Sequence, residues 1–367
     1  MGHNMRLSIT DEVAGNLIKL VPSTRYQGSK RQVLPWLYEN LKELEFETAL
    51  DGFGGTASVS YMFKMMGKSV TFNDILSSNY QSGVALIENN SVTLDQPDID
   101  FLLRENGFKY PSFIQETFRD IYYTDPENKW LDTISFNIEM LSRLYGGNLL
   151  RKKRALACHA LFQACLCKRP FNLFHRRNLY LRTANIKRSF GNKTTWDTDF
   201  PSLYLRFADE LSKKVFSNGK KNKAMCRDIM GIHEKDFDLV YLDPPYTRPS
   251  ASHPKDYYAL YHFLEGIVAY ENWASRIDWS TPNRRLLKRK NSWENHSLEK
   301  NLECLFERFR NSIIVVSYGH PGNPSISRIK ELLSRFKSHV TVAEKEYVYK
   351  LNHRNGEGLY EALIIGR

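Results

Sequence analysis

The sequence predicts an α/β fold in which a mostly parallel sheet carries helices on both faces and a β-hairpin closes one edge. Three observations support this prediction. Short apolar runs recur along the chain, and several of them end at an acidic residue. Stretches with helical patterns separate these runs, and two longer strand-like runs around a polar turn follow at the end. Sheets of this kind place their ligands at the carboxyl ends of the strands, where those acids stand.

Each strand is assigned from a short apolar run that is bounded by glycine or polar residues. Residues 237–242 (FDLVYL) illustrate the pattern, because their nearly uninterrupted apolar character is typical of a buried parallel strand. The last two strands flank the turn at residues 353–358. In chain order, the predicted strands are residues 48–53, 69–72, 223–226, 237–242, 312–317, 340–351 and 359–365.

The middle of the chain interrupts this alternation with helical patterns. One helix is predicted to begin at Pro126, behind Thr124 and Asp125, and another to cover about residues 149–168 and stop before Pro170. We therefore expect one discontinuous α/β domain, residues 21–95 and 223–367, with a mainly helical region, residues 96–222, inserted into it.

The charge of the chain points to a polyanionic partner. The 367 residues carry a formal net charge of +11, and residues 151–193 contain 12 lysines and arginines with no acidic residue. A solvated helix face would normally mix both signs, whereas interleaved aromatic and asparagine side chains suit a nucleic acid. The residues expected to contact nucleic acid are Arg151, Lys152, Arg169, Asn172, His175, Arg176, Arg177, Arg182, Lys187, Arg188 and Lys193.

The five cysteines are odd in number and have no C-x-x-C spacing. We therefore expect reduced thiols rather than a disulfide framework, helix packing rather than a metal site around Cys158 to Cys167, and no bound metal. No apolar run approaches the length of a membrane span, and the amino terminus has no apolar signal segment. The expected location is the cytoplasm.

The most informative motif is Asp243-Pro244-Pro245-Tyr246, which directly follows a predicted buried strand. The two prolines fix the backbone and remove two N–H donors, so the carbonyls of Asp243 and Pro244 stay available as acceptors. One carboxylate, free carbonyls and an aromatic ring can hold a flat base whose exocyclic amine has two hydrogens to donate. An ordinary Pro-Pro turn is the alternative reading.

A glycine-rich turn follows the first predicted strand, in the sequence Asp51-Gly52-Phe53-Gly54-Gly55. Such a turn lets the backbone approach a ligand, and an acid at the end of the second strand, here Asp74, can accept from a ribose hydroxyl. Asp51 before the glycines suits a ligand with an ammonium group, such as S-adenosylmethionine, better than a dinucleotide. Asp228, which ends the third strand, is placed to accept from an adenine amine.

Taken in order, these motifs resemble those of the D12-class, Dam-like DNA adenine-N6 methyltransferases. The resemblance covers about residues 24–75 and 223–367, with the inserted region between them. More loosely, residues 169–176 (RPFNLFHR) resemble modification methylases of type IIS restriction systems such as FokI. Gly52 departs from the pattern, since many relatives have proline there. The matching segments are residues 25–30 (RYQGSK), 51–56 (DGFGGT), 73–74 (ND), 226–228 (CRD), 243–246 (DPPY), 257–262 (YYALYH) and 361–366 (EALIIG).

The resemblance implies a Rossmann-like class I methyltransferase sheet that binds S-adenosylmethionine and double-stranded DNA, with residues 96–222 as the target-recognition region. Asp243 and the Pro244 carbonyl would accept the two N6 hydrogens of an adenine that has left the duplex and stacks on Tyr246. A restriction endonuclease of the same system would be a possible partner. The residues implied at the cofactor are Tyr26, Lys30, Asp51, Gly52, Phe53, Gly54 and Gly55 for the methionine end, Asp74 for the ribose, and Asp228 and Ile229 for the adenine.

Several alternatives stay open at this point. A DNA cytosine-N4 methyltransferase uses the same physics on another exocyclic amine, although Asp243 rather than serine before the prolines favours adenine. RNA would suit the basic aromatic insert as well as DNA would. Protein amide methylation would favour asparagine at position 243. A silent DNA-binding protein on the same scaffold would be expected to lose Asp51, Asp74, Asp228 and Asp243, all of which are present. The absence of a Pro-Cys dipeptide argues against cytosine-C5 chemistry.

Overall fold

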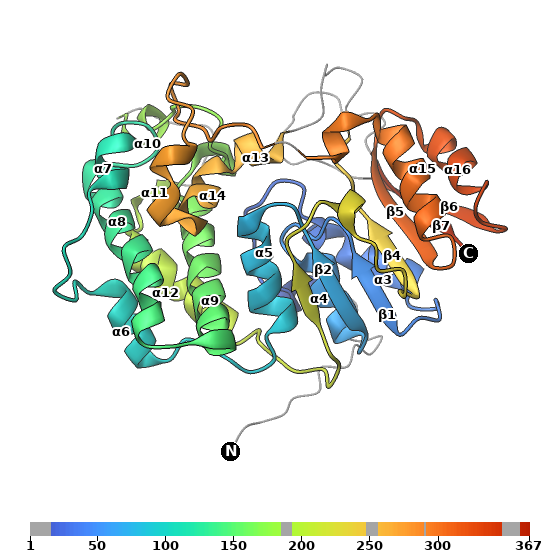
Figure 1. The fold of residues 1–367 in the computed structure, drawn as a ribbon, viewed down its shortest axis with the longest axis horizontal. Helices are drawn as coiled ribbons and strands as arrows, with labels where there is room; N and C mark the ends of the chain where they lie inside the picture. Colours follow the sequence, from blue (N-terminus) through green and yellow to red (C-terminus); the bar gives the residue numbers. More distant parts are fainter. Residues whose placement is uncertain (1–15, 185–192, 247–255, 290, 347–359) are drawn as a thin grey trace.

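A computed structural model describes residues 16–184, 193–246, 256–289, 291–346 and 360–367. It contains a seven-stranded sheet with helices on both faces and a group of helices beside it (Figure 1). The strands are β1 (Thr48–Asp51), β2 (Ser69–Asn73), β3 (Lys223–Met225), β4 (Leu239–Leu242), β5 (Ile313–His320), β6 (Val340–Glu346) and β7 (Tyr360–Gly366).

The strand order is β3-β2-β1-β4-β5-β7-β6, and β1 to β5 pair in parallel. Strand β7 runs antiparallel to both β5 and β6, so the closing hairpin inserts its second strand between its first strand and the parallel part. The predicted α/β fold and its strands are confirmed. Residues 347–359, which include the predicted turn, lie outside the described residues.

Alternate residues of each central strand face two separate hydrophobic layers, as the pleat of a strand requires. Ala49 and Tyr241 belong to one layer, and their neighbours Leu50 and Val240 belong to the other. Helices α15 and α16 contribute to the second layer, and the remaining helices near the sheet contribute to the first. These helices are α3 (Leu34–Leu41), α4 (Ser58–Met65), α5 (Ser77–Gly83), α14 (His262–Val268), α15 (Leu298–Arg308) and α16 (Ile326–Leu333).

The predicted inserted region is helical. The first turn of helix α8 (Asp125–Met140) is stabilised by Glu127, whose carboxylate accepts from the Thr124 N–H at 2.9 Å. Helix α9 buries Cys158, Cys165 and Cys167 as free thiols and packs against both α5 and α12. The helices are α6 (Gln96–Leu103), α7 (Phe113–Thr117), α8 (Asp125–Met140), α9 (Gly147–Cys167), α10 (Tyr180–Thr183), α11 (Lys193–Asp197) and α12 (Phe200–Ser212).

These helices share one hydrophobic core with the first face of the sheet, because Leu161 of α9, Phe72 of β2 and Ala85 beside α5 belong to the same cluster. Figure 1 shows them gathered beside α5, toward the end of the sheet that contains β3 and β2. The exact domain boundaries stay a prediction. None of the helices in the described ranges combines the length and apolarity needed to cross a membrane.

Candidate active site

The carboxyl ends of the parallel strands surround a cavity of about 1460 Å³. The polar residues that end β1, β2, β3 and β4 are separated in sequence, and the parallel pairing brings them to this one edge. Asp51 and Gly54 face a smaller recess beside it. The other predicted catalytic and cofactor residues line the cavity: Tyr26, Lys30, Gly52, Phe53, Gly55, Asp74, Asp228, Ile229, Asp243, Pro244, Pro245 and Tyr246.

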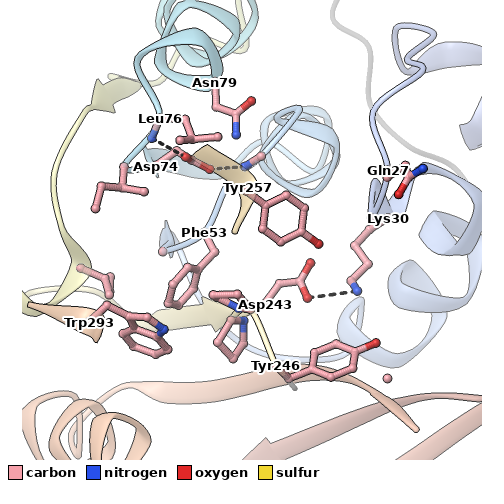
Figure 2. A pocket seen from close by; sticks show the side chains of 18 of the residues that line it. Gln27, Lys30, Phe53, Asp74, Leu76, Asn79, Asp243, Tyr246, Tyr257 and Trp293 are labelled. Carbon is pink, nitrogen blue, oxygen red and sulfur yellow. Dashed lines mark hydrogen bonds and ion pairs between the residues drawn. The ribbon is translucent and has the colours of Figure 1, made fainter. Parts of the chain in front are cut away.

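Lys30 links two carboxylates in this cavity. Its ammonium lies 3.0 Å from Asp243 Oδ1 and 2.8 Å from Glu361 Oε1, and Ser317 donates to the same Glu361 oxygen at 2.7 Å. Figure 2 shows the Lys30 side chain reaching across to the Asp243 carboxylate. The position of Lys30 is fixed because Ser29 caps its short helical turn η1 (Lys30–Val33) by accepting from the Arg31 N–H.

The surroundings of Lys30 and Asp243 shift the pKa of each of these two groups. Burial raises the pKa of Asp243 to about 6, while Lys30 lowers that pKa and Glu361 raises it. Although burial favours the neutral amine, Asp243 and Glu361 raise the pKa of Lys30 well above its ordinary value. Lys30 therefore stays charged near neutral pH, and Asp243 is a carboxylate above about pH 6. The carbonyl of Pro244 accepts no hydrogen bond from the described residues. This agrees with the prediction from the two prolines that it stays available as an acceptor.

Asp51 is a buried carboxylate with spare hydrogen-bonding capacity. Its Oδ2 accepts from the Ser60 N–H at 3.2 Å and from the Ser60 hydroxyl at 2.6 Å. Its Oδ1 is buried and has no partner among the described residues. Burial raises the pKa of Asp51 to about 7. An unpartnered acceptor of this kind fits a cationic group of a ligand in the adjoining recess.

Asp74 organises the glycine-rich turn. Its Oδ2 accepts from the Gly55 N–H and its Oδ1 from the Leu76 N–H, both at 2.8 Å, and burial raises its pKa to about 6. A Cβ atom at Gly54 would lie 2.2 Å from the Phe72 ring, so this glycine is required by packing against the sheet. Sequence reasoning had attributed the glycines to ligand approach alone.

Another part of the cavity wall carries Asp228 and the aromatic rings of Phe53 and Trp293. Asp228 accepts from the N–H groups of Met230 at 3.0 Å and Ser292 at 2.6 Å, which fixes its orientation. Phe53 meets Trp293 edge to face, with their ring centroids 5.0 Å apart (Figure 2). Together these residues form an apolar corner of the cavity with one carboxylate beside it.

Two further aromatic groups border the site. The Tyr26 ring is stacked on Tyr261 with centroids 4.1 Å apart, and Tyr257 lies nearly parallel at 6.0 Å. This stack brings together segments 25–30 and 257–262. Tyr246 packs at 4.8 Å on Tyr318, and a Cβ atom at Gly319 would lie 2.0 Å from its hydroxyl oxygen. The ring of Tyr246 therefore needs a glycine on β5.

The structure corrects two of the predicted nucleic-acid contacts. Arg169 is only 1% exposed; it donates to the carbonyls of Leu173, Tyr122 and Arg176 and to the side chain of Asn178. The side chain of Arg182 is 6% exposed and pairs with Glu127 at 2.6 Å. Both predictions were wrong because these arginines hold the interior of the helical region together.

Ion pairs within the protein also weaken the argument from the net charge of residues 151–193. Arg151 pairs with Glu88, Lys153 with Asp98 and Arg154 with Glu139, so acids from outside this segment neutralise much of its charge. Arg176, Arg177 and Lys193 are exposed, His175 and Lys152 are half-buried, and Asn172 lines the cavity. For these six residues and for Arg151, nucleic-acid contact stays a prediction. Lys187 and Arg188 lie outside the described residues.

Sequence reasoning missed Glu361 and Trp293 as site residues. In the sequence, Glu361 is only the first residue of a matching segment in the closing strand, and the one available signal is that it is an acid in an otherwise apolar strand. Trp293 lies in a polar segment without a strong pattern. The sequence does not show that Glu361 pairs with Lys30 or that Trp293 contacts Phe53, because each pair is distant in the sequence.

Comparison with known proteins agrees with the geometry. Residues 26–276 match the model of the family described as D12 class N6 adenine-specific DNA methyltransferase. The chain is also 28% identical over 360 residues to the type II methyltransferase M2.HphI of Haemophilus parahaemolyticus, a match that covers 94% of this chain and 96% of that protein.

Proposed function

Because the chain belongs to the D12 class N6 adenine-specific DNA methyltransferases, we propose that it transfers the methyl group of S-adenosylmethionine to the N6 amine of an adenine turned out of double-stranded DNA. The observation that carries this proposal is the cavity that joins Asp243, Pro244 and Tyr246 to Asp74 and Asp228, the acids that follow β2 and β3, with Asp51 in the adjoining recess. A base inside a duplex cannot reach such a cavity, so it must leave the stack.

The residues of the cavity fit S-adenosylmethionine, which would supply an activated methyl group on a positively charged sulfur. The unpartnered Oδ1 of Asp51 suits the ammonium of its methionine end. Asp74 would accept from the ribose, and the apolar side chains of Phe53, Trp293 and Ile229, with Asp228 beside them, suit the adenine. Tyr26 closes the side toward the methionine end.

The chemical role of Asp243 follows from its charge and its backbone. As a carboxylate it accepts one N6 hydrogen of the target adenine, and the Pro244 carbonyl accepts the other. Holding both hydrogens aims the nitrogen lone pair away from the acceptors and toward the methyl donor. Tyr246 offers its ring face to the base, a contact worth about 1–3 kcal/mol per base. Lys30 keeps Asp243 charged and oriented.

The test is to incubate the protein with labelled S-adenosylmethionine and duplex DNA and to identify the modified base by mass spectrometry. We expect N6-methyladenine in DNA. Label in cytosine, or label in RNA in preference to DNA, would contradict the proposal. Sequencing of methylated bases in DNA from cells that express the protein would then give the recognition sequence.

We also propose that the protein is the modification enzyme of a restriction system and acts in the cytoplasm. This proposal is supported by the near full-length similarity to a type II methyltransferase. DNA from expressing cells should resist a cognate endonuclease that reads the same sequence, and full cleavage of that DNA would count against this role.

The pH dependence of methyl transfer should report on Lys30. Because the reaction needs the Asp243 carboxylate, the single-turnover rate should fall as the pH drops through about 6. Lys30→Met removes a positive charge 3.0 Å from Asp243, so the acidic limb of the profile should move up by about 1–3 pH units. Lys213→Met, at the exposed residue that directly follows α12, is the control. An unmoved limb in Lys30→Met would show that this pair does not set the protonation of Asp243.

A further inference from the structure

Residues 276–287 form a short hairpin that the charge analysis of the sequence did not single out. Ile277 bridges Leu286 in antiparallel fashion, the Asp278 N–H donates to the Arg285 carbonyl at 2.8 Å, and the Leu287 N–H donates to the Arg276 carbonyl at 2.7 Å. Ile277 and Leu286 are buried in the main core, so the base of the hairpin is anchored. In Figure 1 the hairpin is the orange loop that projects from the top of the helical side.

The tip of this hairpin carries an exposed indole beside a guanidinium. Trp279 is 54% exposed. Arg284 donates to the Trp279 carbonyl at 3.0 Å, and its guanidinium carbon lies 5.3 Å from the centroid of the Trp279 ring. Arg284 adopts φ = 55°, a left-handed conformation that is unfavourable for a non-glycine residue. A turn within the hairpin accounts for this conformation, because the Arg284 N–H donates to the Thr281 carbonyl at 3.2 Å, and the turn fixes the position of the guanidinium beside the exposed indole.

The hairpin and its continuation are strongly basic. Residues 276–290 contain six lysines and arginines and a single acid. Arg285 makes a long contact of 3.5 Å with Asp278, and Lys288 pairs with Glu294 at 2.8 Å on the exposed surface. Unlike Arg169 and Arg182 in the central block, Arg285 and Lys288 are exposed. Exposed positive charge is therefore concentrated here as well as at Arg176 and Arg177.

The hairpin is also joined to the rim of the cavity. The Asn283 carbonyl accepts from the Tyr122 hydroxyl at 3.0 Å, and its amide donates to the Phe174 carbonyl at 3.1 Å. Phe174 belongs to the loop that contains Asn172, and both Asn172 and Lys288 line the cavity. A duplex that delivers a base to the cavity from this side would meet the hairpin and this loop together.

We propose that the hairpin of residues 276–287 is a second DNA-contacting element, which binds backbone phosphates of the duplex beside the cavity through Arg284 and Arg285. Trp279 positions the guanidinium of Arg284 at the tip through its carbonyl and its ring. This inference rests on the proposed function, since it takes double-stranded DNA as the partner. The hairpin follows residue 276, where the family match ends.

The test compares a double variant, Arg284→Gly with Arg285→Ala, with a matched control, Arg104→Ala with Lys213→Ala. Glycine accepts the left-handed conformation at position 284, so the melting temperature should be maintained. The control removes two exposed basic residues that, like Arg285, pair with an acid on the surface. Duplex affinity is measured at several salt concentrations, for a duplex with the sequence that the protein methylates and for a scrambled one.

We expect the hairpin variant to bind both duplexes more weakly and to show a shallower salt dependence, by roughly 0.9 log units per log unit of salt for each phosphate that is no longer neutralised. The affinity for S-adenosylmethionine should be unchanged. Wild-type affinity and salt slope in the hairpin variant would overturn this inference, as would an equal reduction in the control. If the wild-type protein in the same preparation fails to methylate DNA, the proposed function fails instead.

Discussion

Replacing Asp243 by alanine should reduce the single-turnover rate of methyl transfer by at least about a hundredfold, the range found when a positioned proton acceptor or charge-stabilising group is removed from a catalytic site. The variant loses the acceptor for one N6 hydrogen, and it also leaves the buried ammonium of Lys30 with Glu361 as its remaining carboxylate partner. DNA affinity should change little, because Asp243 faces the cavity rather than the duplex surface. Quenched-flow assays with labelled cofactor would measure the rate.

The control is Asp238→Ala. Asp238 directly precedes strand β4, whereas Asp243 directly follows it. Asp238 accepts from the Thr48 N–H at 2.9 Å, so its loss tests the stability of the sheet without touching the cavity. A rate above a tenth of wild type in Asp243→Ala would remove Asp243 from the reaction. A comparable loss in both variants would assign the effect to the fold of β4.

Asp51→Asn should make the folded protein more stable at neutral pH while weakening the binding of S-adenosylmethionine. Burial raises the pKa of Asp51 from 3.8 to about 7, so the folded state binds its proton more tightly than the unfolded state does. The stabilisation that this proton provides is present below about pH 4 and is lost as the pH rises to about 7. At 1.36 kcal/mol per pKa unit, the ionised carboxylate costs up to about 4 kcal/mol above that range.

Urea unfolding of both proteins between pH 4 and pH 8 would measure this difference. The advantage of Asp51→Asn over wild type should grow across the interval from pH 4 to 7 and then level off. Asp238→Asn provides a control of opposite sign, because hydrogen bonds from Glu47 and Thr48 lower the pKa of Asp238. Calorimetry would follow cofactor affinity. Unchanged affinity in Asp51→Asn would refute its assignment to the ammonium group.

The strands and the edge that carries the site were predictable because their signal is local. Apolar runs such as the one before Asp243 determine strands, and parallel strands bring their following residues to one edge. The pairing of Lys30 with Glu361 was not predictable, since it depends on β7 entering the sheet between β5 and β6. Nothing near either residue in the sequence indicates the other.

Arg169 shows the opposite failure. In the sequence it stands in a basic block with aromatic neighbours, which is the composition of a nucleic-acid surface. In the structure it occupies the interior, where backbone carbonyls replace water as its hydrogen-bond acceptors and the Tyr122 ring faces its guanidinium at 4.3 Å. Counting charges along the chain cannot separate these two uses of arginine, because burial and the positions of distant carbonyls are properties of the fold.

The core that α9 shares with α5 and the sheet limits how the specificity of such an enzyme can be altered. If residues 96–222 recognise the target sequence as predicted, a chimera that exchanged them for those of a relative would disturb the packing of α9 against α5. Such grafts should unfold unless α5 is exchanged with them. New target sequences should therefore be easier to reach by changing exposed residues of this region, such as Arg176 and Arg177, than by transplanting the whole helical region.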